Sequence, residues 1–275
     1  MSIVFGLCFA LGIGISDFLG GFATRQQHAL TIVLGMLVGG AATSALLLTV
    51  VPSTFRIEDV GLGAVSGVTV GFALMAMFHG LARSSPAVVS PPAALVSTLF
   101  PIMFDVITGG VLEGLVIAGV VVGLVGIVLS SISPDLGSAV KVGLLWGLIA
   151  GALFGSALTF LAGTSEASGV WPAVSQRSVA LVLLFVVASQ QNIPRFPVRG
   201  VRIVALASGV FGSLAVAAFA VGTQRGSITQ VAVAGATFPA VTAALAAAFR
   251  FHPLRWWQVV GIGACIGGVA LMAVA

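Results

Sequence analysis

The chain has 275 residues, of which 59% are apolar and only 7% are charged, and its net charge is +4. Such a chain has too little polar surface to cover a water-soluble globule, so its composition predicts a membrane protein. Its few arginines lie singly at helix ends and form no patch for a nucleic acid. In hydrocarbon every backbone N–H and C=O needs an internal partner, which leaves helices or a closed barrel. Because the apolar runs are long and do not alternate, we predict an all-α integral membrane protein.

Ten apolar segments are long enough to cross the hydrocarbon core, which takes about 20 helical residues. They cover residues 2–23, 29–51, 59–82, 86–109, 113–132, 140–162, 170–189, 201–223, 228–249 and 255–275. Loops of only a few residues join them, so substrate handling has to take place within the helical bundle. The first segment follows Met1 without a basic region or a cleavage site, and we expect it to be retained.

The first segment contains one acidic residue, Asp17. A charge at the centre of a span costs roughly 2.5–3.5 kcal/mol on insertion scales, so Asp17 is expected to face the bundle interior or a watery cavity. Two interpretations remain open. Asp17 is either a substrate or proton site, or a hydrogen-bonded acid near the membrane interface.

The sixth segment repeats the pattern of the first. When GLLWGLIAGALFG from Gly143 is aligned with GLCFALGIGISDF from Gly6, Trp146 corresponds to Phe9, and Phe154 corresponds to Asp17. The acid therefore occurs in one half only. A site between two such halves would be chemically asymmetric, as a substrate with a polar and an apolar end requires, and Trp146 is a candidate for its lining.

The seventh segment carries Gln176 and Arg177, whereas the second segment, its counterpart, holds no polar residues other than threonine and serine, Thr43 and Ser44 among them. Arg177 lies some way into the span, where a cation is expensive unless it reaches the interface or a partner. It is either an interfacial anchor or a site residue, with Asp17 as its natural counter-ion in the other half.

The third segment ends close to His79, which is a candidate proton relay or a partner for free carbonyl groups at the helix end. Prolines inside the fourth and ninth segments remove helix hydrogen bonds and allow bends. Interrupted spans at matching places of two halves indicate the binding site in transporters, although kinks without substrate contact are equally open here. The helix-break candidates are Pro91, Pro92, Pro101 and Pro239, and Gln230 of the ninth segment is a further candidate site residue.

A motif that occurs twice indicates a duplication. Each copy has a reverse turn, a proline in the next apolar segment and glycines in the segment after it. Pro101 to Gly123 and Pro239 to Gly261 are both spacings of 22 residues. We therefore expect five-helix repeats at residues 1–136 and 137–275. Five spans in each repeat, an odd number, give the two repeats opposite orientations in the membrane.

Cysteine and metal chemistry find no support in the sequence. Cys8 and Cys265 lie singly within apolar segments, and we expect both to be buried packing residues. No spacing of histidine, cysteine or acidic residues is typical of a metal site, and no motif indicates a cofactor or an enzyme. We expect a protein without catalytic residues, metal or cofactor.

The chain resembles the EamA-type members of the drug/metabolite transporter superfamily over nearly its whole length. The resemblance rests on motifs that occur in the family's order: Ser16 to Gly21, the turn Ser85–Pro86, Pro101, Glu113, the glycines of the fifth segment, Pro172 with Arg177, and the weaker copy that ends at Gly268. It implies ten helices in two inverted repeats, around a cavity lined chiefly by the first, third, fourth, sixth, eighth and ninth segments. It also implies export of amino acids or other metabolites, and no substrate signature carries over. The chain departs from the family in lacking a glutamate at 251 or 252.

Charge and resemblance disagree about orientation. The loops after odd-numbered segments hold eight of the basic residues: Arg25, Arg83, Lys141, Arg195, Arg199, Arg202, Arg250 and Arg255. The loops after even-numbered segments hold only Arg56 and Arg225. The positive-inside rule therefore places both termini outside, whereas the family resemblance implies termini inside.

These observations predict a multi-pass carrier of the bacterial inner membrane. It would move a small, amino-acid-like metabolite by alternating access, with protons as one candidate coupling ion and with exchange or uniport equally open. A broad-specificity drug exporter and a non-transporting membrane scaffold are the alternatives. The expected partners are the substrate and the lipid bilayer, and the protein is expected to be a monomer or a homodimer.

Overall fold

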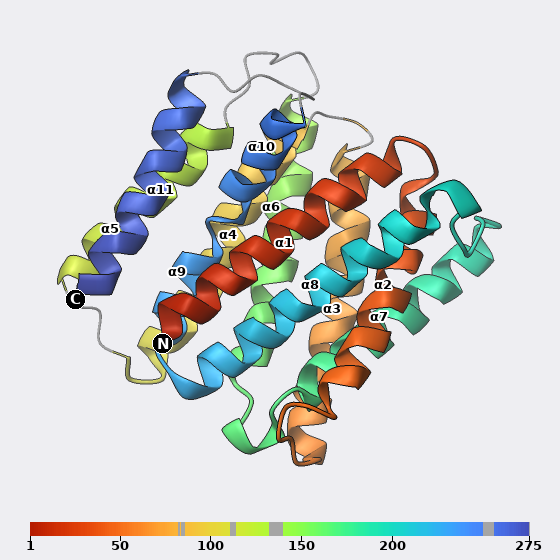
Figure 1. The fold of residues 1–275 in the computed structure, drawn as a ribbon, viewed down its shortest axis with the longest axis horizontal. Helices are drawn as coiled ribbons and strands as arrows, with labels where there is room; N and C mark the ends of the chain where they lie inside the picture. The colour runs from red at the N-terminus through yellow and green to blue at the C-terminus, as the bar shows by residue number, and fades with distance from the viewer. Residues whose placement is uncertain (82, 84–85, 111–113, 132–139, 250–255, 275) are drawn as a thin grey trace.

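The computed structural model describes residues 1–81, 83, 86–110, 114–131, 140–249 and 256–274. These residues form eleven α-helices, one short 3-10 helix and no strand (Figure 1), which confirms the all-α prediction. The helices are α1 (Ser2–Thr24), α2 (Ala29–Leu47), α3 (Ile57–Leu81), α4 (Pro86–Ile107), α5 (Gly114–Ser131), α6 (Val140–Ala162), η1 (Glu166–Ser168), α7 (Trp171–Gln190), α8 (Arg199–Arg225), α9 (Ile228–Gly235), α10 (Phe238–Ala248) and α11 (Trp256–Val274). The boundary expected at residues 136 and 137 lies outside the described residues, and so do Glu113, Arg250 and Arg255.

Six of these helices are long and apolar enough to cross a membrane, counted over the described residues: α1, α2, α3, α6, α7 and α8. The chain is therefore a multi-pass membrane protein. Shorter apolar helices cover Pro92–Ile107, Ile117–Gly126 and Ile228–Thr242. The count of ten spans remains a prediction.

The ninth predicted segment is divided into two helices. Helix α9 ends at Gly235 and α10 begins at Phe238, so the chain leaves the helix directly before Pro239. A proline fits the first turn of a helix because its missing N–H has no intrahelical acceptor there. The Thr237 hydroxyl donates to the Ala234 carbonyl at 2.7 Å, which satisfies one group at the break.

Helix α4 is continuous, so the breaks predicted at Pro91, Pro92 and Pro101 are not present. A proline removes one hydrogen bond but need not end a helix when neighbouring helices hold it in place. Close packing against the glycines of α6 provides that support. Pro101 is buried.

Glycines on α3 and α6 bring helices into close contact. Gly147, Gly151 and Gly155 recur every fourth residue on α6 and face α4, as the atoms nearest to each show. On α3, Gly67 faces α7 so closely that an added Cβ would lie 2.6 Å from the Gln176 carbonyl oxygen. Without a hydrophobic force between helices in lipid, such close contacts supply much of their association.

Replacing Gly67 by alanine is expected to destabilise the protein by about 1–3 kcal/mol, because the new methyl group meets backbone atoms that cannot move aside freely. Gly61→Ala is the matched control on the same helix, since nothing lies within 4 Å of that position. Thermal unfolding in detergent should show a lower Tm for Gly67→Ala alone. Equal Tm values for the two variants would contradict the close contact.

Each of the main helix contacts between the two halves of the chain has an equivalent contact in which the corresponding helices of the two halves are interchanged. Helix α1 packs against α8 and against α9 and α10, while α6 packs against α3 and α4. Likewise α2 packs against α8, and α7 packs against α3. Helices α5 and α11 form a pair at one edge of the bundle (Figure 1). The two halves of the chain are therefore interlocked and do not form separate domains.

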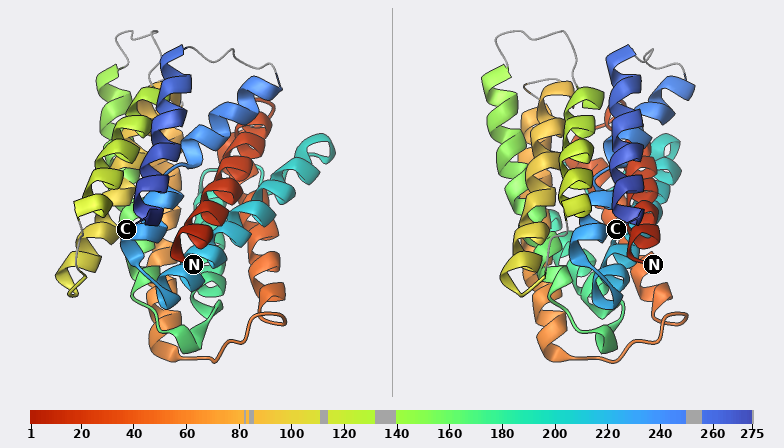
Figure 2. Two further views of the ribbon diagram at one scale, coloured as in Figure 1. Left: turned by 60° about the vertical axis from the view of Figure 1, so that its left-hand side comes forward. Right: turned by 90° about the vertical axis from the view of Figure 1, so that its left-hand side faces the viewer.

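The bundle has two ends of different character, seen side-on in Figure 2. We call one the terminus end, because the N-terminus, the 163–170 loop and the turn between α8 and α9 lie there. We call the other the basic end, because Arg25, Arg83, Lys141, Arg195 and Arg199 lie in its loops or helix ends.

Helix α1 carries an exposed apolar stripe that includes Val4, Leu7 and Leu11. Cys8, which the sequence analysis expected to be buried, is exposed beside this stripe. Lipid solvates apolar side chains on the outside of a membrane protein, so a small hydrophobe has no need of burial. The stripe marks the face of α1 that points towards lipid.

Candidate functional site

A single apolar cluster closes the centre of the bundle at the terminus end. Its buried members come from six helices and include Phe9, Ile102, Leu161, Ala173, Phe219 and Val231. Each of these residues lies in the terminus-end half of its helix. The rings of Phe9 and Phe219 are 5.2 Å apart between centroids. The middle of the bundle is therefore packed solid at this end, and we call this cluster the apolar seal.

The packing at the basic end is made of several smaller clusters. One cluster there, with Ala23, Ile32 and Val201, joins α1, α2 and α8. Another, with Ala76 and Ala150, joins α3, α4 and α6. Among the described residues, no apolar cluster at this end joins α1 or α8 to α3, α4 or α6. A third cluster, with Leu34, Val70 and Leu184, joins α2 and α7 to α3, so the two groups are held together at this end through α2 and α7.

Asp17 lies in the basic-end half of α1, where no apolar cluster of the described residues joins α1 directly to α3, α4 or α6. It shares its helix face with Ala10 and Ile13, which pack inward, because residues four and seven apart lie on the same side of a helix. This face is turned away from the lipid stripe, and yet Asp17 is exposed. One turn further on, Gly21 has no atom within 4 Å of an added Cβ. Asp17 therefore borders open space on the inner side of α1, above the apolar seal.

The carboxylate of Asp17 has no hydrogen bond or ion pair within the described part of the chain. An acidic group that stands on an inner face without a partner is available for a ligand or a proton.

Arg177 reaches into the bundle from α7, where its Nη2 donates to the Gly212 carbonyl at 2.7 Å. Its Nε is buried and has no partner among the described residues. Beside it, Gln176 Nε2 donates to Ser66 Oγ at 2.7 Å, while the buried Oε1 of Gln176 is unpartnered. Buried polar atoms without partners are costly, so these atoms are the ones that a bound solute can satisfy.

Buried hydroxyl groups surround Arg177 and form a polar layer at mid-depth. Ser16 and Ser208 lie 3.1 Å apart between hydroxyl oxygens. Ser44 and Ser213 are also in hydrogen-bond contact. An added Cβ at Gly212 would lie 2.9 Å from Ser16 Oγ and 3.6 Å from Arg177 Nη2. Ser16, the neighbour of Asp17, and Arg177 therefore flank the same glycine, from opposite halves of the chain.

The remaining candidates lie elsewhere. His79 and Trp146 meet with 4.2 Å between ring centroids. However, His79 is on the helix face of exposed Val68 and Phe72, which points outward. Gln230 lies in the first turn of α9 at the terminus end, where its backbone N–H donates to Ser227 Oγ at 3.3 Å. The structure thus places Ser16, the chain neighbour of Asp17, and Arg177 against the same glycine, while Gln176 turns to Ser66 of α3. His79, Trp146 and Gln230 lie elsewhere.

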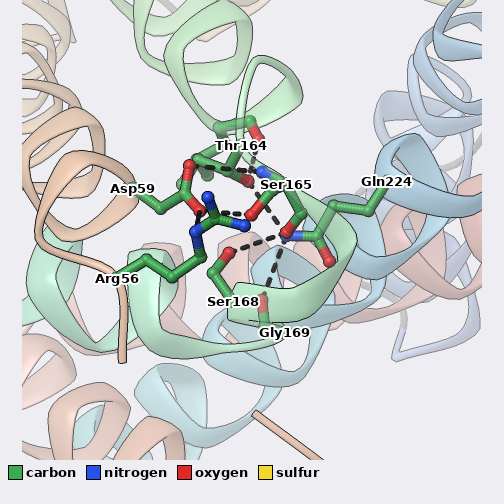
Figure 3. Close-up of polar contacts among 8 residues, drawn as sticks. Arg56, Asp59, Thr164, Ser165, Ser168, Gly169 and Gln224 are labelled. Atoms are coloured by element: carbon green, nitrogen blue, oxygen red, sulfur yellow. Dashed lines mark hydrogen bonds and ion pairs between the residues drawn. The ribbon is translucent and has the colours of Figure 1, made fainter. Parts of the chain in front are cut away.

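Polar contacts reinforce the apolar seal at the terminus end (Figure 3). The buried carboxylate of Asp59 on α3 accepts hydrogen bonds from the Ser165 backbone N–H, at 3.2 Å, and from the Ser165 hydroxyl. Gln224 of α8 donates to Thr164 Oγ1 at 2.9 Å and to the Gly169 carbonyl at 3.1 Å. These bonds tie α3 and α8 to the loop between α6 and α7.

A further polar contact joins the halves nearby, where Asp105 of α4 accepts from the backbone N–H and the hydroxyl of Thr229 on α9. The roles of Asp59 and Gln224 were not predicted from the sequence. The available signal was an acid in the first turn of the third segment together with the hydroxyl-rich stretch at Thr164, Ser165 and Ser168.

Comparison with known proteins adds a family and a fold. Residues 141–274 match the model of the EamA-like transporter family. No curated protein matches the chain. Among solved structures, one described as "Crystal structure of protein" has a TM-score of 0.79 at 17% sequence identity, and the alignment covers 100% of this chain and 99% of that one. At that identity the likeness establishes a shared fold over the full length.

Proposed function

We propose that this chain, whose residues 141–274 belong to the EamA-like transporter family, is a secondary transporter that moves a small amino-acid-like metabolite through the centre of the bundle. The observation that carries the proposal is the position of Asp17. It is exposed on the inner face of α1, on the basic-end side of the apolar seal, and the unpartnered Nε of Arg177 lies in the polar layer that includes Ser16.

The charges of the site favour a zwitterionic substrate. A guanidinium binds a carboxylate well, because its planar donors match the two oxygens. Asp17 is the complementary group for an ammonium. Phe154, which corresponds to Asp17 in the second half, packs against the cluster of Ala76, Ala93 and Ala150, and it suits an apolar substrate side chain. A purely cationic drug is disfavoured by Arg177.

Alternating access requires that the opening move from one end to the other. The interchanged helix contacts support inverted repeats, in which the same contacts can form with the roles of the halves reversed. In the opposite state the apolar seal and the Asp59 and Asp105 contacts would separate. The positive-inside rule puts the basic end in the cytoplasm, so the present opening would load substrate from the cytoplasm, as an exporter requires.

Flux measurements test the proposal directly. Proteoliposomes loaded with a mixture of amino acids should lose one or a few of them faster than protein-free vesicles, as measured by mass spectrometry of the retained contents. Retention equal to that of protein-free vesicles for every compound, with correctly folded protein in the membrane, would reject an amino-acid carrier and favour another metabolite or a scaffold.

A further inference from the structure

An apolar groove with a basic rim lies between α2 and α7 at the basic end. Its volume is about 370 Å³, and its walls include Leu34 and Val38 of α2 and Leu181, Val182 and Phe185 of α7. Val182 is 64% exposed and Phe185 is 45% exposed, although both side chains are apolar. Helices α2 and α7 lie side by side at one edge of the bundle (Figure 1), so the groove faces lipid.

Arg195 forms the rim of this groove. Its guanidinium carbon lies 5.3 Å from the centroid of the Phe185 ring, an arrangement that holds the cation over the apolar wall. Arg195 is exposed and has no acidic partner in the part of the chain that the structure describes. The neighbouring Arg202 is engaged with Phe196 and the Pro197 carbonyl, and Arg195 is the cation that lines the groove.

The surrounding charges favour an anion. Of the described acidic residues, Glu58, Asp59, Asp105 and Glu166 lie at the terminus end, and Asp17 lies within the bundle. None lies beside Arg195. Arginine at the end of a membrane helix is at the depth of lipid head groups, where it attracts anionic ones.

A second groove makes the contrast clear. It lies between α4 and α5, has a volume of about 250 Å³ and is lined by Leu95, Leu124, Val125, Val128 and Leu129. None of these lining residues is charged, so they would accept a lipid chain without regard to its head group. The α2–α7 groove, by contrast, combines an apolar channel with a cation at head-group depth.

We propose that the α2–α7 groove is a binding site for an anionic phospholipid. One acyl chain lies along Leu34, Val38 and Val182, and the phosphate pairs with Arg195. The site is separate from the substrate path, because Arg177 points into the bundle from the same helix while Val182 and Phe185 point out.

Native mass spectrometry of the full-length protein with added phosphatidylglycerol or phosphatidylcholine of identical acyl chains tests this site. The wild-type protein should retain phosphatidylglycerol in preference to phosphatidylcholine. Arg195→Gln should weaken that retention about fivefold, the factor expected for one basic residue near an anionic head group. Arg199→Gln, in the same region but outside the groove, is the matched control and should retain the lipid. Val182→Trp fills the groove without changing charge and should also reduce retention.

Three outcomes would overturn the proposal. One is equal retention of the two lipids, and another is an equal effect of Arg195→Gln and Arg199→Gln, which indicates a diffuse charge effect. The third is a protein dimer that Val182→Trp disrupts, which assigns the groove to a second copy of the chain.

Discussion

Replacing Arg177 by methionine is expected to reduce transport by about 100-fold or more. The substrate carboxylate would lose its guanidinium partner, and removing one partner of a buried charge-assisted contact costs about 2–5 kcal/mol. Methionine keeps the length and apolar stem of the side chain and removes the guanidinium that donates to Gly212 and carries the unpartnered Nε. Initial rates of counterflow in proteoliposomes, at equal amounts of reconstituted protein, measure the effect.

The thermal stability of the Arg177→Met variant distinguishes a substrate-binding role of Arg177 from a structural role. Arg177 makes one described hydrogen bond and leaves one buried donor unsatisfied, so its loss should change Tm little or raise it. Arg199→Gln, at the exposed start of α8, is the control and should transport normally. If Arg177→Met unfolds the protein, or if its flux equals that of wild type, Arg177 is not a substrate ligand.

Replacing Asp17 by asparagine is expected to abolish the response of transport to a proton gradient. Carriage of one proton per substrate sustains up to about a tenfold concentration ratio for each pH unit, which corresponds to about 1.4 kcal/mol. Asparagine preserves size and hydrogen bonding but cannot bind a proton. In a proton-coupled carrier the substrate ratio across the membrane under an imposed pH difference should therefore fall to one, while downhill exchange continues more slowly because the substrate ammonium loses its counter-charge.

One outcome would contradict the predicted role of Asp17 in proton coupling. Accumulation that stays at the wild-type level in Asp17→Asn vesicles would remove Asp17 from proton coupling. Asp59→Asn at the terminus end provides a comparison, because this carboxylate is hydrogen-bonded to Ser165 and is not placed in the open space of the bundle.

Composition and apolar segment length were sufficient to predict the helical membrane fold. A chain this poor in charge belongs in lipid, where its backbone groups need internal hydrogen bonds, and long apolar runs meet that need as helices. The family followed from the order of weak motifs, and the match of residues 141–274 confirms it. Proline positions predicted less well. The helix breaks before Pro239, but α4 continues through Pro101. Whether a proline breaks a helix depends on the packing around it. For α4 that packing comes from the glycines of α6, which the sequence of α4 does not reveal.

The site was only partly predictable for a similar reason. A charged residue inside an apolar segment is conspicuous, so Asp17 and Arg177 could be identified as candidates. Their inward direction depends on which face of each helix meets its neighbours. His79 and Trp146 fit the same sequence criteria and instead meet near the outer face of α3. The layer of hydroxyl groups could not be predicted from the sequence, because a single serine is ordinary in a membrane helix. Its members are Ser16, Ser44, Ser208 and Ser213.

The proposed transport path requires that Asp17 be reached by water from the basic end, on the open side of the apolar seal. The direct test is the labelling of single cysteines at position 17 and at Leu11, in a background in which Cys8 and Cys265 are replaced by serine. Leu11 is the control because it belongs to the lipid stripe of the same helix. We predict that Asp17→Cys reacts with a membrane-impermeant thiol reagent added at the basic end, while Leu11→Cys does not. An Asp17→Cys thiol as unreactive as that at position 11, or one reached only from the terminus end, would contradict the account.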